Sequence, residues 1–594
     1  MWKVRWLYVA IVLAGFLALP GWVQGKALDN QDRGAGGTHA ADVRREACTP
    51  RALADAPWEP NVIVNDDVTL LTQAFASIAV DSDLNAYAAW EDYRNGNSDP
   101  DIYFSYRPAG GPWGANVRVN DDAGTLGQHY PSIAVDPGGN AYVAWGDYRH
   151  GMDNPDIFFS YRPSGGSWGA NVQVNDDVGT AFQLHVSLAV DPDGNAYAVW
   201  EDFRNGHYDI YFSYRPSGGA WGANVRVNDD TGTEEQWHPS ISVDHSGNAY
   251  AVWADRRDGV DRQVYFSYRP AGGSWSDNVM VIDDAGEGTQ GNPIIAADPS
   301  GNAYAVWEDG REGNPDIYSS YRPSGGAWGA NVRVNDDAST EEQEEPFVAV
   351  DSRGNAYAVW HDWRNGEYDP DIYFSSRPAA GSWSANVRVN DDAVSAWQFN
   401  PTLVVDSGGS AYALWEDTRT DPPYAGDIYF SYLERQAWLG DRVWHDADQD
   451  GLQEAGEPGV QGILVTLYAT GGCTGPSLAT ENTDSNGHYL FTSLPASTYC
   501  LRFSNIAPSW TISPRNRGPD DTVDSDADPS TAQIQSVILA AGSDEFDQDV
   551  GVYEEGEFVP EPGTAVMLAA GLAGLGGFAC IPWARRQLRR VVRS

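Results

Sequence analysis

The sequence predicts an all-β protein: a seven-bladed β-propeller followed by a β-sandwich, with hydrophobic helices only at the two ends of the chain. Three observations support this fold class. A pattern of the form V-D-x-x-G-N-A-Y-x-x-W recurs, with small variations, seven times at intervals of 53 to 55 residues. The chain holds 63 Gly, 35 Pro and 24 Trp among 594 residues, a composition typical of turn-rich aromatic sheet proteins. The repeat stops after Tyr432, where a different pattern begins.

The N-terminal end predicts export. Residues 1–25 combine a basic start, an apolar run and small residues before a cleavage point, as in a secretory signal peptide. An N-terminal membrane anchor is the alternative, although the apolar run is short for a bilayer span. Residues 26–57 form a polar leader. The formal net charge of −47 excludes nucleic acid as an expected partner.

Residues 58–435 hold the repeat. Each unit contains four short apolar or alternating segments separated by turn residues, and four strands per unit predict a propeller blade. A solenoid is the alternative for any repeat, but units of this length without helical periodicity favour radial closure. Residues 58–65 match the fourth segment of a unit, whereas the last unit ends after its third segment, residues 427–432. We therefore expect the first segment to complete the last blade and leave no unpaired inner edge.

Side chains that recur in every unit predict the frame of the propeller. Two tryptophans per unit are interpreted as wedges between blades, with a ligand platform as the alternative. An Asp and an Arg two residues apart, such as Asp92 and Arg94, are expected to brace a loop, with binding as the alternative. Asn-Asp-Asp triplets, such as residues 120–122, end a strand where side chains can cap a turn, and a calcium role is left open there.

The repeat resembles the sialidase-like and related Asp-containing propeller families through the motif V-D-x-x-G-N-x-Y, as in residues 135–142. The resemblance implies the architecture alone. The Asp-box order S-x-D-x-G-x-x-W is not followed, and no catalytic residue of that family maps onto this chain.

One glutamine per unit marks a candidate ligand site. It stands eight residues before the repeated Asp, and the two residues after it vary and are rich in aromatic and histidine side chains. A constant frame with variable residues is how a scaffold presents a site, so we predict that an extracellular glycan or protein binds at the channel mouth. The structural alternative is that the glutamines satisfy the backbone of the adjacent blade. The candidates are Gln73, Gln128, His129, Tyr130, Gln183, His185, Gln236, Trp237, His238, Gln290, Gln343, Gln398 and Phe399.

Asp446 opens a twelve-residue pattern typical of calcium loops. Acidic residues occupy positions 1, 3, 5, 9 and 12, glycine occupies position 6, and position 7 offers a backbone carbonyl. The alternative is an acidic, solvated loop. Flanking helices are not indicated, so the loop is expected on a β-sandwich. The predicted Ca²⁺ ligands are Asp446, Asp448, Asp450, Leu452, Glu454 and Glu457.

Residues 436–554 resemble the SdrD B-like modules, prealbumin-like (Cna B-type) sandwiches, through the calcium loop, T-D-S-N-G-H-Y-L-F at residues 483–491 and D-V-G-V-Y at residues 549–553. The resemblance implies a calcium-stiffened stalk. Cys473 and Cys500 stand near the ends of two expected strands and predict a disulfide in an exported protein. A later acidic run is left open as part of the first calcium site or as a second one; its members are Asp520, Asp521, Asp524, Asp526 and Asp528.

Residues 555–594 end the chain with Pro560, Glu561 and Pro562, an apolar stretch and an Arg-rich tail. Length and flanking charge fit a membrane span with its tail inside. The three-part order resembles a PEP-CTERM sorting signal, which implies an exosortase-type processing enzyme as a partner. A plain C-terminal anchor is the alternative. Both place the domains outside the cytoplasm, at the cell surface or beyond it, and held to the membrane by the C-terminal segment before processing.

These features predict an exported, surface-associated and non-catalytic module for recognition, adhesion or the extracellular matrix. The propeller would present a ligand site on a calcium-stiffened stalk. One alternative is a sialidase-like, glycan-processing enzyme at the channel mouth, where Glu341, Glu342, Glu344 or Glu345 with a histidine could form a general acid–base pair, although no catalytic residue is assigned. The other alternative is a purely structural spacer.

Overall fold

In the computed structural model the regular elements are all β-strands, and the residues it describes include no helix. Within this described part, therefore, no helix is long and apolar enough to cross a membrane. The predicted signal peptide, leader, sorting signal with Pro560, Glu561 and Pro562, and terminal helices lie outside the described residues. The structure describes residues 58–554, except residues 70, 97–98, 260, 284–287, 339, 367–368, 380, 394, 421–424, 436, 455, 470, 495–496, 518–523, 540–543 and 546.

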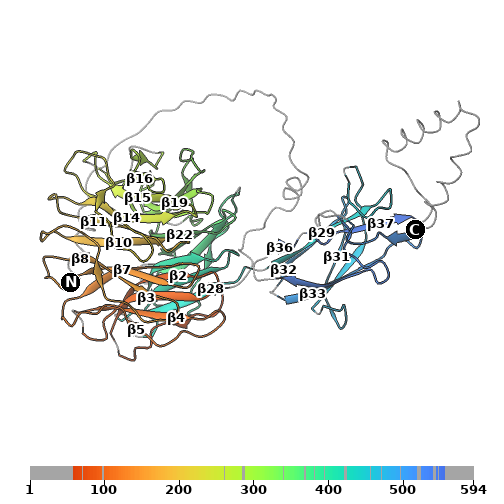
Figure 1. Cartoon of the computed structure of the whole chain (residues 1–594), viewed down its shortest axis with the longest axis horizontal. Helices are drawn as coiled ribbons and strands as arrows, with labels where there is room; N and C mark the ends of the chain where they lie inside the picture. Colours follow the sequence, from red (N-terminus) through yellow and green to blue (C-terminus); the bar gives the residue numbers. More distant parts are fainter. Residues whose placement is uncertain are drawn as a thin grey trace, which may run out of the picture. The chain divides into compact units, whose positions relative to one another are not determined.

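Seven antiparallel sheets of four strands follow one another along the repeat region (Figure 1). The first strands are β2 (Gln73–Val80), β6 (Gln128–Val135), β10 (Gln183–Val190), β14 (Gln236–Val243), β18 (Gln290–Ala297), β22 (Gln343–Val350) and β26 (Gln398–Val405). The second strands are β3 (Ala86–Asp92), β7 (Ala141–Asp147), β11 (Ala196–Asp202), β15 (Ala249–Asp255), β19 (Ala303–Asp309), β23 (Ala356–Asp362) and β27 (Ala411–Asp417). The third strands are β4 (Asp101–Arg107), β8 (Asp156–Arg162), β12 (Asp209–Arg215), β16 (Gln263–Arg269), β20 (Asp316–Arg322), β24 (Asp371–Arg377) and β28 (Asp427–Leu433). The fourth strands of the first six sheets are β5 (Val117–Arg118), β9 (Val172–Gln173), β13 (Val225–Arg226), β17 (Val279–Met280), β21 (Val332–Arg333) and β25 (Val387–Arg388).

The seventh sheet takes its fourth strand from the other end of the region. β1 (Val62–Ile63) pairs antiparallel with β28, with Val62 opposite Phe430 and Ile63 opposite Tyr429. The backbone N–H of Glu59 also donates to the carbonyl of Tyr432 at 2.9 Å. The expectation that residues 58–65 complete the last repeat is therefore confirmed.

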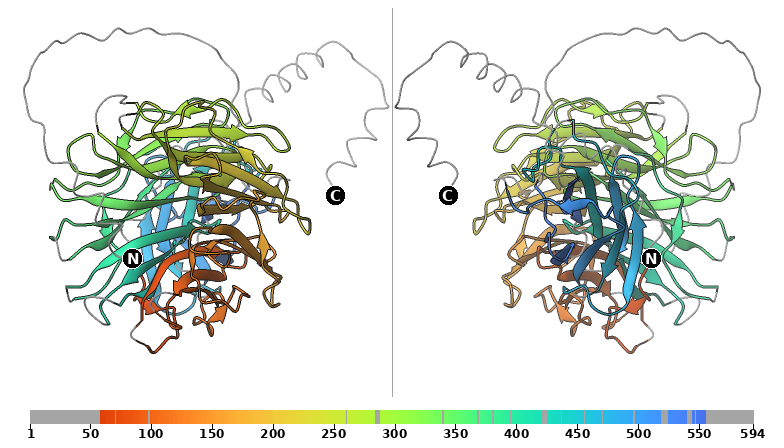
Figure 2. Two further views of the ribbon diagram at one scale, coloured as in Figure 1. Left: turned by 90° about the vertical axis from the view of Figure 1, so that its left-hand side faces the viewer. Right: turned by 90° about the vertical axis from the view of Figure 1, so that its right-hand side faces the viewer.

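Consecutive sheets pack through their first strands, and β26 of the seventh sheet also packs against β2 of the first. The colours of the strands accordingly succeed one another around the repeat region in Figure 2. One apolar cluster joins Ile78 and Trp90 of the first sheet to Leu414 and Phe430 of the seventh. In six of the seven sheets the tryptophan that precedes the fourth strand packs edge-on against a phenylalanine of the neighbouring sheet, as Trp113 does on Phe430 at 5.2 Å between ring centroids. In the remaining sheet Trp383 donates to the hydroxyl of Ser319 at 2.9 Å. These tryptophans are wedges between sheets, as predicted.

The repeated Asp closes the turn between the first and second strands. Asp136 accepts the N–H groups of Gly138 at 2.9 Å and Asn140 at 3.1 Å, and the hydroxyl of Tyr142 at 2.9 Å. The next residue of the motif, Gly139, has a φ of +74°, and a Cβ there would lie 2.9 Å from the Tyr87 hydroxyl of the preceding sheet. Glycine adopts this backbone conformation without strain and leaves room for the neighbouring sheet. The first unit has Leu84 at the same position, with a φ of 64°.

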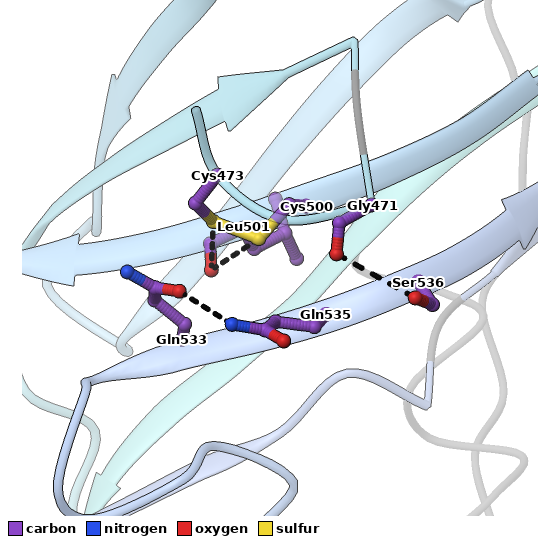
Figure 3. Close-up of a disulfide and its surroundings, with 7 residues drawn as sticks. All are labelled: Gly471, Cys473, Cys500, Leu501, Gln533, Gln535 and Ser536. Carbon is purple, nitrogen blue, oxygen red and sulfur yellow. Dashed lines mark hydrogen bonds between the residues drawn. A yellow bond between two sulfur atoms is a disulfide. The ribbon is translucent and has the colours of Figure 1, made fainter. Parts of the chain in front are cut away.

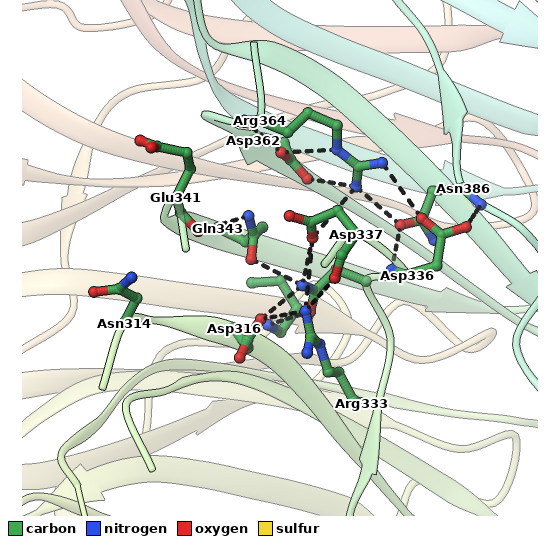
Figure 4. A network of polar contacts seen from close by, with 12 residues as sticks. Asn314, Asp316, Arg333, Asp336, Asp337, Glu341, Gln343, Asp362, Arg364 and Asn386 are labelled. Carbon is green, nitrogen blue, oxygen red and sulfur yellow. Dashed lines mark hydrogen bonds and ion pairs between the residues drawn. The ribbon is translucent and has the colours of Figure 1, made fainter. Parts of the chain in front are cut away.

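An arginine braces the other end of each second strand (Figure 4). The Arg364 guanidinium contacts Asp362 of its own sheet at 2.7 Å and Asp336 of the preceding sheet at 3.3 Å, and it donates to Asn386 at 3.0 Å. The bracing role predicted for the Asp–Arg pairs is confirmed. The same pairing to the Asp two residues earlier holds for Arg94, Arg149, Arg204, Arg257, Arg311 and Arg419.

The strands after the repeat region form a two-layer β-sandwich, the fold that was predicted, and the first of them begins at Ala437. Its core lies between the layers and includes Leu439, Val443, Leu467 and Leu501, all fully buried. In one layer β29 (Ala437–His445) pairs with β32 (His488–Leu494), β36 (Asp544–Glu545) and β37 (Val550–Glu554), and β37 pairs with β34 (Trp510–Ile512). The other layer has the order β31 (Ser477–Asn482), β30 (Leu464–Tyr468), β33 (Ser497–Ser504) and β35 (Gln533–Leu539).

A disulfide joins Cys473, in the loop after β30, to Cys500 on β33, with the Cα atoms 5.1 Å apart (Figure 3). Both cysteines are buried, and Cys473 lies in a turn with a φ of 47°. The predicted disulfide is confirmed.

Candidate functional site

Each first strand of the repeat region begins with a β-bulge. In β10, Leu184 pairs with Glu201 and Ser187 with Val199, so that two residues on one strand face a single residue on the other. The second residue after each glutamine has a φ between 45° and 54°. A left-handed backbone at a residue other than glycine costs energy, and bulges that re-aim a side chain in this way gather next to binding sites. We name as the bulge residues Phe75, Tyr130, His185, His238, Asn292, Glu345 and Asn400.

The glutamines before the bulges are buried, with exposed fractions of 0–1%. The amide of Asn120 donates to Gln128 Oε1 at 2.7 Å, and Gln128 donates to the carbonyl of Leu126 at 2.7 Å. An Asn–Gln bond of this kind links consecutive sheets at six of the seven junctions. At the seventh, Ile282 occupies the position of the asparagine that would bond to Gln290. These contacts favour the structural alternative for Gln73, Gln128, Gln183, Gln236, Gln290, Gln343 and Gln398.

Four glutamates, three of them buried and Glu308 half-buried, hold bulges in place, and the sequence reasoning did not single them out. Each accepts the backbone N–H of the bulge residue in the next sheet. The pairs are Glu91 with Tyr130 (2.7 Å), Glu201 with His238 (2.7 Å), Glu308 with Glu345 (2.7 Å) and Glu416 with Phe75 (2.8 Å). The signal was present, because this position between the repeated Trp and Asp varies while both neighbours are constant; the other sheets have Gly146, Ala254 and His361 there.

Side chains of the bulge residues contact one another from sheet to sheet. Ring centroids lie 4.9 Å apart for Phe75 and Tyr130, 4.6 Å for Tyr130 and His185, and 5.4 Å for His185 and His238. All seven bulge residues are half-buried. The set therefore combines an aromatic and imidazole stretch, from residue 75 to 238, with an amide and carboxylate stretch, from residue 292 to 400.

The remaining predicted ligand residues are the first residues after their glutamines. His129 Nδ1 lies 3.1 Å from Glu91 Oε2; burial works against a charge on His129, but Glu91 outweighs it and raises the pKa of His129. The guanidinium of Arg262 lies 5.9 Å from the Trp237 ring. Phe399 is half-buried and pairs with Glu416 across the ladder.

Two of the bulge residues, His185 and His238, meet the carboxylate of Glu201. His185 Nδ1 lies 2.9 Å from Glu201 Oε2, and one ligand atom from each of the three residues lies within 4.8 Å of the others. Burial lowers the pKa of His238 to about 4, against the opposing charge of Glu201. Burial also works to raise the pKa of Glu201, but His185 and His238 outweigh it and the pKa lies below its usual value. At neutral pH Glu201 is therefore ionised and His238 is neutral.

Glu308 lies beside the acidic bulge residue Glu345, whose backbone N–H it accepts. Burial, followed by the charge of Glu344, raises the pKa of Glu308 to about 7. His361 Nε2 lies 3.1 Å from Glu344 Oε2 and His361 Nδ1 lies 3.5 Å from Glu345 Oε2. Burial opposes a charge on His361, but the two glutamates outweigh it and raise the pKa of His361 to about 10. This part of the molecule thus holds one carboxyl group that titrates near neutral pH beside a charged imidazole.

The predicted calcium loop follows β29 and folds back on itself. Asp446 accepts the N–H groups of Gln449 at 2.7 Å and Gly451 at 3.0 Å. Glu457, twelfth in the loop, accepts the N–H groups of Ala447 at 2.8 Å and of Glu454 at 3.1 Å. These bonds tie the two ends of the loop together and point its carboxylates inward.

The carboxylates of the loop converge in two groups that share Asp448. One group is Asp446, Asp448 and Glu457, the other is Asp448, Asp450 and Glu454, and within each the ligand oxygens lie within 4.8 Å of one another. Burial, followed by the neighbouring carboxylates, raises the pKa of Glu454 to about 7, a sign of crowded negative charge. Several hard oxygen donors in one turn fit the coordination that Ca²⁺ prefers.

Part of the later acidic run approaches this loop. Asp524 pairs through its backbone with Leu452, the loop residue whose carbonyl was predicted as a ligand. The Asp526 carboxylate accepts the N–H of Asp549 at 2.8 Å, and that of Asp528 accepts the N–H of Ser530 at 2.8 Å. The other two predicted members, Asp520 and Asp521, lie outside the described residues.

The sandwich can be compared with known proteins. Residues 437–552 match the model of the SdrD B-like domain. Over 116 residues, this SdrD B-like domain is 39% identical to the serine-aspartate repeat-containing protein C of Staphylococcus aureus strain MRSA252. The same protein of strain N315 is also 39% identical. The match spans 20% of this chain and only 12% of the MRSA252 protein.

Three solved structures resemble a larger share of the chain at low identity. An α-L-arabinofuranosidase of family GH93 from Fusarium graminearum, in complex with arabinobiose, has a TM-score of 0.39 and 16% identity over 63% of this chain and 97% of its own. A protein of unknown function from Dyadobacter fermentans has a TM-score of 0.37 and 10% identity over 64% of this chain and 98% of its own. The NanB sialidase of Streptococcus pneumoniae has a TM-score of 0.36 and 10% identity over 63% of this chain and 70% of its own. At these values the likenesses carry no argument about this chain.

Proposed function

We propose that this chain is an exported, surface-associated recognition module without catalytic activity. A closed seven-bladed β-propeller presents the ligand site, and the SdrD B-like domain forms a calcium-stiffened stalk. The observation that carries the proposal is the set of bulge residues. Seven bulges of the same backbone conformation display five kinds of side chain, and a constant frame with varied side chains is the arrangement of a binding scaffold.

Closure of the propeller is supported by the contacts between the first and seventh sheets. β1 and β28 share one sheet, and an apolar cluster spans the junction between that sheet and the first one. Such a closed ring would hold all bulge residues at one mouth, where a single ligand can touch several of them.

The ligand class follows from the side chains. Aromatic and imidazole rings stack on sugar faces and on the side chains of peptides, while the amides and carboxylates beyond residue 292 hydrogen-bond to polar groups. The four glutamates hold four of the bulges rigid, which reduces the entropy that binding must overcome. An extracellular glycan or protein is therefore the proposed ligand.

The stalk role rests on the calcium loop and on the match of residues 437–552 to the SdrD B-like domain. Asp446, Asp448, Asp450, Glu454 and Glu457 would hold Ca²⁺, together with the carbonyl of Leu452. A bound ion would neutralise the crowded carboxylates and stiffen the loop. Export and surface attachment rest on the sequence of the two chain ends, where an exosortase-type enzyme would process the C-terminal segment.

Substitutions that nature already places in other bulges test the ligand site. Asn occupies the bulge in two sheets, so Phe75→Asn and Tyr130→Asn should preserve the fold while removing aromatic surface. Binding of the full chain is measured on glycan and peptide arrays, with Val172→Ala on an exposed fourth strand as the control. Loss of binding in both bulge variants but not in the control supports the site. Unchanged binding would favour the spacer alternative.

A glycan-processing enzyme is the second candidate, and one observation favours it. Glu308, with a pKa of about 7, can exist as a protonated acid at neutral pH beside Glu344 and Glu345. The discriminating measurement is turnover of a panel of fluorogenic glycosides by the full chain. Turnover that disappears in Glu308→Gln or Glu344→Gln would replace the recognition function by an enzymatic one.

A further inference from the structure

A group of metal-ligating side chains lies where the third and fourth sheets meet. His185 is the bulge residue of β10, Glu201 lies on the adjacent strand β11, and His238 is the bulge residue of β14 in the next sheet. One ligand atom from each lies within 4.8 Å of the other two. Each of the three comes from a different strand, so the group exists only in the folded protein.

The bulges are what bring the histidines to the carboxylate. Leu184 pairs with Glu201, so in a regular strand the following side chain would turn to the opposite face. The φ of 50° at His185 breaks this alternation, and His185 Nδ1 lies 2.9 Å from Glu201 Oε2. The other carboxylate oxygen, Oε1, accepts the backbone N–H of His238 at 2.7 Å and so fixes the second bulge. Glu201 is only 2% exposed, which keeps its carboxylate in one place.

We infer that His185, Glu201 and His238 form a binding site for a divalent transition-metal ion such as Zn²⁺. Two imidazoles and one carboxylate are a ligand set that suits zinc and iron(II), and three protein ligands leave at least one position open to water or to a ligand. Ligand atoms around tetrahedral zinc lie about 3.3 Å apart. The 2.9 Å separation of His185 and Glu201 is close to this value, and the ligand atom of His238 lies within 4.8 Å of both.

The junction between the first and second sheets supplies a control. His129 lies 3.1 Å from Glu91, which also accepts the N–H of a bulge residue, but that bulge residue is Tyr130. One imidazole and one carboxylate are therefore present there without a second histidine. Replacing His129 removes a histidine that contacts a glutamate at the same position of the second strand, without touching the inferred site.

The inference goes beyond the proposed recognition of a glycan or protein and does not require it. Metal binding is measured without any organic ligand, so the two ideas are tested separately. A chain that binds Zn²⁺ but no glycan or protein would support the metal site and contradict the proposed function. A chain that binds a glycan or protein but no Zn²⁺ would contradict the metal site and support the proposed function.

The experiment uses the full chain in excess Ca²⁺, which occupies the carboxylate-rich loop and keeps it from taking up the probe. Zn²⁺ binding is followed by isothermal titration calorimetry, and Co²⁺ binding by its visible absorption. The variants are His185→Asn and His238→Asn, because asparagine already occupies the same bulge at Asn292 and Asn400. The control is His129→Asn, and circular dichroism checks the fold of each protein.

The expected result is one Zn²⁺ equivalent that the wild type and His129→Asn bind and that His185→Asn and His238→Asn both lose. The visible absorption of bound Co²⁺ should disappear in the same two variants. A wild-type chain that binds no Zn²⁺ in excess Ca²⁺ would overturn the inference without reference to any variant. So would folded His185→Asn and His238→Asn proteins that retain the full stoichiometry.

Discussion

Asn65 tests how firmly the first segment is held to the last sheet. Its side chain donates to Gln73 of β2 at 3.0 Å and to Asp427 of β28 at 2.8 Å, and it accepts the backbone N–H of Ile428 at 2.9 Å. The substitution Asn65→Ala removes all three bonds. Asn120→Ala removes the equivalent bonds at a junction where the chain is continuous.

The expected cost follows from burial. Asn65 is 7% exposed, and its partners Ile428 and Gln73 are 0% and 1% exposed, so water cannot replace the lost contacts without opening the junction. Three bonds at about 1 kcal/mol each, with an added penalty for the buried N–H and carbonyl oxygen left without partners, give a loss of about 3–5 kcal/mol in the free energy of unfolding. Asn120→Ala should cost a similar amount.

Hydrogen exchange of the full chain measures the effect at the Ile428 amide, and urea denaturation followed by tryptophan fluorescence measures it globally. Val178→Ala is the control, because this side chain is fully exposed and its replacement should leave the free energy of unfolding unchanged. The reasoning would be refuted if Asn65→Ala cost less than about 1 kcal/mol while Asn120→Ala showed the full loss. That pattern would mean that the first segment contributes little to the last sheet.

Three further predictions concern the disulfide, the Glu308 carboxyl and the calcium loop. Replacing both cysteines of the disulfide by alanine should lower the free energy of unfolding of the SdrD B-like domain by about 3.5 kcal/mol, the chain-entropy value for a sequence separation of 27. Unchanged hydrogen exchange in β33 would contradict this prediction. Burial and Glu344 raise the pKa of Glu308 to about 7, so the folded state retains a proton that the unfolded state releases near pH 4.5. The free energy of unfolding should therefore fall by about 3 kcal/mol as the pH rises from about 4.5 to about 7. Glu308→Gln should abolish this pH dependence in urea denaturation. Calcium chelation should lower the melting temperature of the SdrD B-like domain but not of the repeat region. This drop should be absent in Glu457→Gln and should remain in Asp484→Asn. Equal drops in both regions would argue against the loop as the calcium site.

Much of the fold could be predicted because it is encoded locally. The repeat length, four segments per unit and the turn motif around each Asp specify seven sheets before any contact is known. The pairing of residues 58–65 with the last sheet followed from counting segments, since the first was surplus and the last was missing. The disulfide followed from two cysteines near strand ends in a domain that the sequence predicts to be exported.

The bulges could not be predicted from alternation, because a pattern of period two does not show where one strand gains a residue. Gln128 illustrates the consequence. Its constancy in every unit suggested a place at the mouth, whereas its partner Asn120, eight residues earlier, holds it between two sheets. Glu201 was missed for a related reason: beside Asp202 in a fully buried strand it resembles an ordinary frame residue, and only the bulge of the next sheet reveals its role.

The pairing of β1 with β28 brings the two ends of the repeat region to one place, with Glu59 bonded to Tyr432. A domain whose entry and exit meet in this way can be joined there and reopened in any exposed turn between sheets, as in a circular permutant. It can likewise be inserted into a loop of another protein without separating the flanking chain. The termini of the repeat region could thus be moved to another turn while the bulge residues keep their arrangement.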